Sequence, residues 1–222
     1  MSTLPVYVPL VFGIAVLLAL YFFYRASGYS RLFLVLACIW IVLQSLITLS
    51  GFYTRPLRFP LLVLPPILFG ISYSFTLKGR KFFSTLDVRT LTLLQSIRVL
   101  VELVLFWLAR HHMMPKAMTF EGKNFDILTG LSVPFIYYFG FIRKTMATRW
   151  IILWNWMGIG LLLMAVSIGL SSLLSVGQAT AAAIPGQSPL AIQQFPWSLL
   201  PGFLVPIVFF AHLGSLRRLA KR

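Results

Sequence analysis

Acidic residues are scarce in this sequence, which has four carboxylates against 19 lysines and arginines in 222 residues. Charged residues make up 10% of the chain and hydrophobic residues 59%, with a mean hydropathy of +0.90. A soluble domain has about 25% charged residues. The low polar content therefore excludes an ordinary soluble protein and predicts an all-α polytopic membrane protein.

The sequence also lacks the residues that several chemistries require. The single cysteine, Cys38, excludes an intramolecular disulfide. No glycine-rich phosphate loop, Gly-x-Ser-x-Gly elbow or Cys-x-x-Cys pair is present. The lysines all fall in predicted loops or tails, which excludes a retinal Schiff base in a span. His111 and His112 fall at the outer end of the fourth predicted span and His212 near the inner end of the seventh, so a site that uses all three histidines is not expected. We therefore predict no metal, cofactor or catalytic residue, and the sequence does not decide whether the chain is an enzyme.

Seven apolar stretches are predicted to cross the membrane, since about 20 helical residues span ~30 Å of hydrocarbon. They form a single domain over residues 1–222. The segment 171–194, which carries no charge, is predicted to be a loop before the last span. The predicted spans are 6–24, 32–52, 59–77, 91–108, 127–142, 150–176 and 195–216.

The basic residues predict the orientation of these spans. With the N-terminus outside, the inner segments hold 13 of the 19 basic residues, the outer segments hold five, and Arg98 lies within a span. The positive-inside rule then gives an outer N-terminus and a cytoplasmic C-terminus. The basic excess is thus a topology signal in contact with the lipid bilayer, and nucleic-acid binding is not expected.

A faint internal repeat predicts a plan of three helices, a linker helix and three more helices in the same orientation. Two arginines six positions apart occur at 25 and 31 and again at 143 and 149, and a Phe-Pro pair with a second proline five positions later occurs at 59–65 and 195–201. The predicted repeats cover 6–77 and 127–216, joined by 91–108. This plan resembles SWEET-type carriers in span count and repeat order only, because their Pro-Gln signature is absent.

Glu102 is the carboxylate that stands within a predicted span, four positions after Arg98. On a helix the two residues share one face, about 6 Å apart along the axis. A charge in mid-membrane costs roughly 2.5–3.5 kcal/mol on insertion scales, so the pair should face protein or a wet cavity. We expect Glu102 to carry a proton or engage a cationic group, and Arg98 to hold its charge state or meet an anion.

The predicted outer loop 110–126 concentrates further polar candidates. His112, Glu121, Asn124 and Asp126 would form an external mouth for a ligand. Asn124 can also cap the next helix, with Asp126 in its first turn, and this role is compatible with ligand binding.

Prolines in the third and seventh predicted spans remove backbone donors and tend to kink helices. Pro65, Pro66, Pro201 and Pro206 are therefore candidate hinges, with static shaping of the helices as the alternative.

The stretch from Met118 to Gly130 (MTFEGKNFDILTG) resembles a segment of a family of bacterial inner-membrane proteins with no established function. The similarity extends to residues 90–94, to Arg98 and Glu102, and to the segment 200–212 that ends at His212. The resemblance implies an inner-membrane location, and it supports grouping the acidic residues and His212 as one set of candidate residues. It supplies no activity.

Three functional hypotheses follow. The first is a protein that binds or transports a small solute, with or without coupling to the movement of protons. The second is an intramembrane enzyme acting on a lipid or lipid-linked substrate from an outer site of His112, Glu121 and Asp126. The third is an accessory or assembly protein in which Arg98 and Glu102 are structural. The sequence does not predict an oligomeric state.

Overall fold

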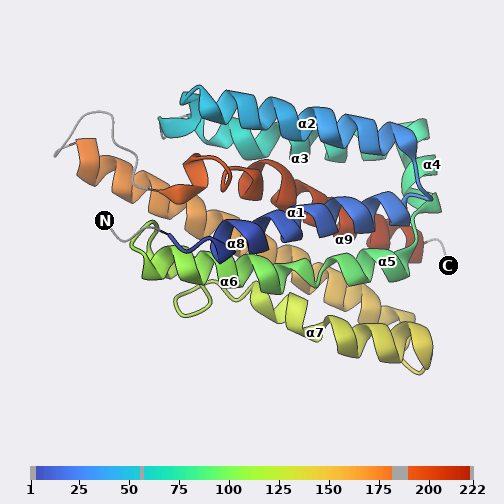
Figure 1. Cartoon of the computed structure of the whole chain (residues 1–222). Helices are drawn as coiled ribbons and strands as arrows, with labels where there is room; N and C mark the ends of the chain where they lie inside the picture. Colours follow the sequence, from blue (N-terminus) through green and yellow to red (C-terminus); the bar gives the residue numbers. More distant parts are fainter. Residues whose placement is uncertain (1–3, 56–57, 182–189, 221–222) are drawn as a thin grey trace.

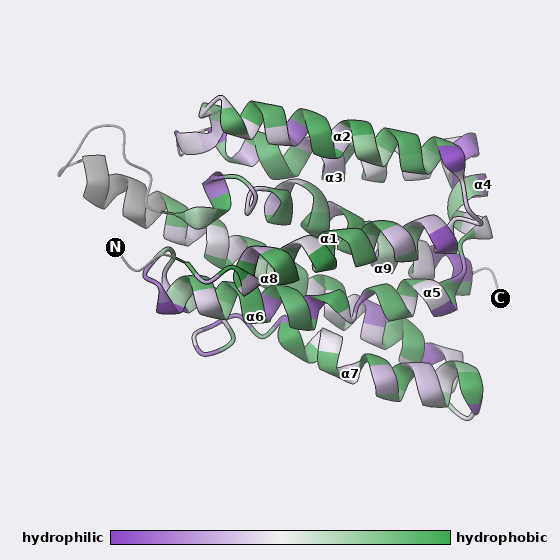
Figure 2. Cartoon of the chain, viewed as in Figure 1, coloured by the Kyte–Doolittle hydropathy of each residue, from purple (hydrophilic) through white to green (hydrophobic). Residues whose placement is uncertain are grey.

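The computed structural model describes residues 4–55, 58–181 and 190–220, and this part of the chain is helical without β-strands (Figure 1). Within it, five helical segments are long and apolar enough to cross a membrane. Their hydrophobic surfaces run along the length of the bundle, and hydrophilic residues gather toward its ends (Figure 2). These segments are Tyr7–Ala26 (α1), Arg31–Leu49 (α2), Val88–Arg110 (α5, Val88–Leu94, and α6, Ile97–Arg110), Thr148–Leu173 of α8 (Thr148–Ala181), and Leu200–Leu219 (the π-helix η6, Leu200–Leu204, and α9, Val205–Leu219).

Helix α3 (Pro60–Phe75) is followed after one residue by α4 (Leu77–Thr85), and the two axes differ by 96°. Thr76 makes the bend because its backbone is extended and its side chain accepts a hydrogen bond from the Gly79 amide at 3.0 Å. Helix α4 therefore lies across one end of the bundle, near the C-terminus (Figure 1). We call this end, which holds α4 and the end of α9, the basic end.

Helix α7 (Ile127–Tyr137) continues as a π-helix, η4 (Tyr138–Ile142), and the two together are shorter than a full span. The chain reaches α7 by a loop, residues 111–126, that runs back from the end of α6 to its middle (Figure 1). Irregular backbone at membrane depth is tolerated where protein buries it. Thr119 and Asn124 of this loop meet that condition, with exposed fractions of 0% and 3%.

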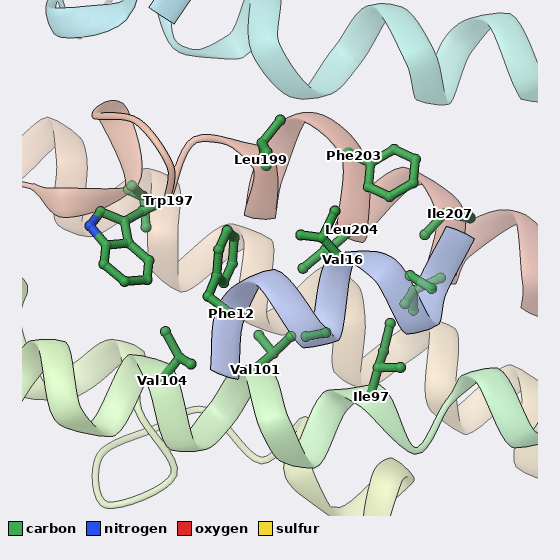
Figure 3. Close-up of a cluster of buried hydrophobic side chains, with 14 of the residues drawn as sticks. Phe12, Val16, Ile97, Val101, Val104, Trp197, Leu199, Phe203, Leu204 and Ile207 are labelled. Carbon is green, nitrogen blue, oxygen red and sulfur yellow. The ribbon is translucent and has the colours of Figure 1, made fainter. Parts of the chain in front are cut away.

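Helix α1 lies between α6 and the η6–α9 segment, and apolar side chains from all three fill the space between them (Figure 3). Ala15 and Ala19 are fully buried, and small residues at such positions let neighbouring helices approach closely. The rings of Phe12 and Trp197 meet edge to face with centroids 5.1 Å apart. This core fixes α6, which carries the charged candidates, against α1 and α9.

The π-helix η6 is tied to α2 by a hydrogen bond from the Trp40 indole Nε1 to the Gly202 carbonyl at 2.8 Å. In an α-helix that carbonyl would accept from residue 206, but Pro206 has no N–H. The Trp40 side chain supplies the missing donor. Close packing completes the junction, since a Cβ at Gly202 would lie 2.8 Å from Leu62 Cδ1.

Each of the seven predicted segments contains a helix, but two details of the prediction are wrong. Helix α8 continues to Ala181, five residues beyond the predicted span 150–176 and into the predicted loop, while residues 182–189 lie outside the described part. The fourth segment begins at Val88 rather than at 91, because the Asp87 carboxylate caps α5 by accepting from the Thr90 amide at 3.1 Å.

Candidate functional site

Six buried polar side chains gather near the middle of the bundle. They come from α6, from the end of the 111–126 loop, from α8 and from α9. Arg98 lies ten residues from the start of Val88–Arg110, which places it about 15 Å along that segment. We call this group the polar core; its members and exposed fractions are Arg98 (2%), Glu102 (2%), Asn124 (3%), Asp126 (7%), Asn155 (1%) and His212 (0%).

The Arg98 guanidinium joins three helical elements at one point. Its Nη1 lies 2.8 Å from Asp126 Oδ1, at the start of α7. Nη1 and Nη2 also donate to the carbonyl of Gly158 in α8, at 3.3 and 3.2 Å. The ion pair expected from the four-residue spacing of Arg98 and Glu102 is not formed within 4 Å, because the guanidinium turns to Asp126 instead.

Glu102 is held by an amide rather than by a cation. The Asn124 Nδ2 group donates to Glu102 Oε1 at 2.6 Å and to the Met118 carbonyl at 3.1 Å. The Asn124 Oδ1 atom accepts from the Asp126 amide at 3.1 Å, so Asn124 serves the start of α7 and Glu102 together. Within the described part of the chain, no basic side chain lies within 4 Å of the Glu102 carboxylate.

The α8 and α9 side of the polar core is built from His212 and Asn155. The Asn155 Nδ2 group donates to the Ile151 carbonyl at 2.8 Å, which turns its Oδ1 toward His212 Nδ1 at 2.9 Å. An amide oxygen only accepts, so the hydrogen of this bond is on Nδ1. The imidazole also lies against Gly158, where a Cβ would come 2.4 Å from His212 Cε1.

Four buried side-chain atoms in the described residues have no hydrogen-bond partner. Three belong to the polar core, and the fourth, Gln95 Oε1, lies one turn before Arg98. An unsatisfied buried polar group costs about 1–3 kcal/mol, so such atoms are rare unless function requires them. The polar core thus offers both donors and acceptors to a ligand. The three atoms are Arg98 Nε, Glu102 Oε2 and His212 Nε2.

The charges of the polar core do not balance. It contains two carboxylates, Glu102 and Asp126, and one guanidinium, that of Arg98, which is already paired with Asp126. With both acids ionised the core carries one surplus negative charge in a medium that penalises charge strongly. A proton on Glu102, or a bound cationic group, removes this surplus.

The structure brings five of the seven candidate binding residues together and leaves two outside. Arg98, Glu102, Asn124, Asp126 and His212 all lie in the polar core, while His112 and Glu121 lie elsewhere. Metal-binding groups of three or more His, Cys, Asp or Glu side chains are absent from the described residues.

The two outlying candidates occupy the surface of the 111–126 loop. The Glu121 carboxylate lies 3.2 Å from Lys116 Nζ and 3.7 Å from Arg110 Nη2. His112 is exposed, with a positive φ of 58°. Since Asp126 is buried with Arg98, the three residues of the hypothetical outer enzyme site have separate partners and surroundings.

The four candidate hinge prolines differ in surroundings. Pro65 and Pro66 lie inside α3, with Pro65 exposed and Pro66 half-buried. Pro201 and Pro206 are buried, and Pro201 falls within the π-helix η6. π-helical turns are uncommon and are frequently found at functional sites.

Sequence reasoning missed Asn155, Gln95 and the Gly158 carbonyl. Asn155 gave a signal that could have been used, since it is a neutral amide inside the apolar segment 150–176. Because Asn155 is uncharged, it was not among the candidates chosen for a charge within a span. A backbone carbonyl such as that of Gly158 leaves no trace in the residue types.

This combination of long apolar helices and a buried, charged centre defines an all-helical membrane protein with a polar core. Residues 60–220 match a family model described as "Domain of unknown function (DUF8737)", and because the match covers more than half of the chain, the protein belongs to that family. The matched range includes the whole polar core. Neither a curated protein nor a solved structure matches the sequence.

Proposed function

We propose that this protein binds a small solute in the polar core and moves it across the membrane, with Glu102 exchanging a proton or engaging a cationic group of the solute. One observation carries the proposal: Glu102 is a buried carboxylate in surplus over the one guanidinium of the polar core, with no basic side chain within 4 Å of it among the described residues. A purely structural charge in mid-membrane would be expected to have its full set of partners, because each missing one costs free energy.

The surrounding backbone supports a carrier. Helix α7 begins at Ile127, directly after Asp126 and beside the middle of α6, following an irregular segment. Transporters build their sites near the bilayer midplane from helices interrupted in this way. The π-helices η4 and η6 add two irregular points, and Pro201 in η6 would serve as a hinge together with Pro206, while Pro65 and Pro66 would let α3 bend.

We further propose that α3, and α7 with η4, complete seven spans of an inner membrane, with the N-terminus outside and the C-terminus in the cytoplasm. The cations of α4 and of the turn between η4 and α8 lie toward one end of the bundle, in keeping with the positive-inside rule. The repeats 6–77 and 127–216 around the linker 91–108 remain part of this proposal, and the transport proposal does not depend on them.

Replacement of Glu102 by Gln tests the function. The amide keeps an acceptor for Asn124 but can neither ionise nor release a proton. Native mass spectrometry of gently purified wild type should detect a small molecule retained by the protein, and the Glu102→Gln variant should lose it. Proteoliposomes given that molecule on the outside should then show uptake that responds to a proton gradient in the wild type only.

The matched control is Glu121→Gln, since Glu121 is a surface acid of the same chemistry outside the polar core. It should retain ligand and uptake. A Glu102→Gln variant that binds with wild-type affinity and transports at the wild-type rate would contradict the proposal.

A further inference from the structure

A cleft of about 400 Å³ opens at the basic end of the bundle, beside the first residues of α8. It lies where three chain segments meet: the α4–α5 junction, the turn between η4 and α8, and the end of α9. Neither the sequence motifs nor the transport proposal assigns it a role.

Three cations line this cleft: Arg89, Lys144 and Arg218. Among the described residues, none of the three side chains forms an ion pair with a carboxylate within 4 Å. The cleft contains one acid, Asp87, whose carboxylate accepts from the Thr90 amide at 3.1 Å and from the Thr90 hydroxyl at 2.6 Å. With three cations against this one carboxylate, the cleft keeps a net positive charge.

The cleft has a charged rim and an apolar floor. Arg89 and Lys144 are exposed, whereas Leu86, Ile151 and Leu219 are 1–5% exposed. Arg218 is half-buried and is fixed by a hydrogen bond from its Nη1 to the Ser84 carbonyl. Cations above an apolar floor match the amphipathic boundary between a phosphate headgroup and its hydrocarbon.

Lys144 occupies a backbone position that does not favour lysine. Its φ is +55°, in the left-handed region that glycine adopts without steric cost. The strained position turns a cation into the cleft where glycine would be the unstrained residue. This coincidence of strain and charge gives a direct way to separate ligand binding from folding.

We propose that the cleft is a phosphate-binding site, for the phosphate group of an anionic membrane lipid or of a small soluble phosphate ester. The two sources share the chemistry that the three cations recognise. Lipid reaches the site from the bilayer and a soluble ester from the cytoplasmic solution, so the experiment treats them as separate arms. The site is independent of transport through the polar core.

The test uses the full chain in nanodiscs of phosphatidylcholine with and without phosphatidylglycerol, with lipids retained on the protein measured by native mass spectrometry. Wild type should retain phosphatidylglycerol preferentially. Lys144→Gly and Arg89→Gln should each weaken this retention about tenfold, as expected for loss of one charge-assisted hydrogen bond. Lys123→Gln, which removes an exposed cation of the 111–126 loop, should leave it unchanged.

Inorganic phosphate added in the second arm distinguishes the sources. Retention that phosphate does not compete away supports a lipid headgroup, and competition in the millimolar range or below supports a site open to soluble esters. Lys144→Gly should unfold at a temperature equal to or above that of the wild type, so lost binding cannot be attributed to misfolding. Retention without preference for phosphatidylglycerol, together with no phosphate binding, or equal retention in all variants, would overturn the proposal.

Discussion

Arg98 forms its ion pair with Asp126, 28 residues away in the chain, at a distance of 2.8 Å. Glu102, on the same helix as Arg98, is left to the amide of Asn124. The two acids of the polar core therefore have different surroundings, and replacing each should have a different consequence.

Asn124 should be important for stability although it carries no charge. Its replacement by leucine removes hydrogen bonds to Glu102 and Met118 and from the Asp126 amide, all in buried surroundings. We expect the free energy of unfolding to fall by about 2–3 kcal/mol. Unfolding in mixed detergent micelles measures this loss. Replacement of exposed Lys123 by Ala should stay within about 0.5 kcal/mol, and an Asn124→Leu variant as stable as the wild type would mean that these bonds do not form.

The Arg98–Asp126 pair should show strong coupling in a double-mutant cycle. Arg98→Met or Asp126→Leu alone leaves one buried charge without its partner and should cost about 3–5 kcal/mol. The double variant should recover much of this loss, because neither member of the pair is then left as an unpaired buried charge. Additive losses, without recovery, would contradict the pairing.

The same double variant distinguishes a carrier from an accessory protein. In a carrier it should fold and yet lose the retained solute, because the guanidinium of the polar core is gone. If the pair is only structural, as in an accessory protein, the double variant should fold and retain the same molecules as the wild type. Native mass spectrometry and circular dichroism of the same preparation measure ligand and folding together.

Gly158 should not tolerate a methyl group. A Cβ there would lie 2.4 Å from His212 Cε1 and 2.5 Å from Nε2, so α8 and α9 would have to separate. We expect Gly158→Ala to lower the free energy of unfolding by about 1–3 kcal/mol, the usual cost of overpacking. Gly160→Ala is the matched control, since nothing lies within 4 Å of a Cβ at that position. It should be neutral or stabilising by up to about 1 kcal/mol, and equal effects at both positions would show that His212 does not pack against Gly158.

Labelling of introduced cysteines tests the orientation. Cys38 is the single native cysteine, so a Cys38→Ser background accepts single cysteines in place of Lys81 in α4 and of Lys123 in the 111–126 loop. In intact cells an impermeant maleimide should label position 123, and position 81 only after permeabilisation. The reverse pattern would invert the proposed topology. Labelling of both from one side would mean that the α5–α6 segment does not cross the membrane.

The helices could be predicted because long apolar runs determine them with little help from tertiary contacts. The segment 171–194 was predicted to be a loop because it is rich in small residues and has no charge. Its first part is nevertheless helical, in keeping with its alanines and leucines, which are good helix formers. The position of the 111–126 loop could not be predicted from the sequence either, since its polar composition suggests a solvated turn. Its return to mid-depth depends on contacts made by Asn124 and Asp126 with α6.

Five of the six members of the polar core were predicted as candidates, but their pairing was not. Rarity of charge in an apolar segment marked Arg98 and Glu102, and a local spacing of four residues suggested that they pair. The observed partners are 28 and 22 residues away. Long-range geometry selects among partners of equal chemistry, and one sequence does not contain that geometry.

The guanidinium of Arg98 has a mechanical consequence. By bonding to Asp126 and to the Gly158 carbonyl, it pins α6, the start of α7 and the middle of α8 to one another. Any motion that opens the polar core at low cost must leave this three-way joint closed. On the α9 side the polar core is held differently: His212 makes one side-chain hydrogen bond, to Asn155, and the Leu200–Leu219 segment is the most buried of the five membrane-length segments.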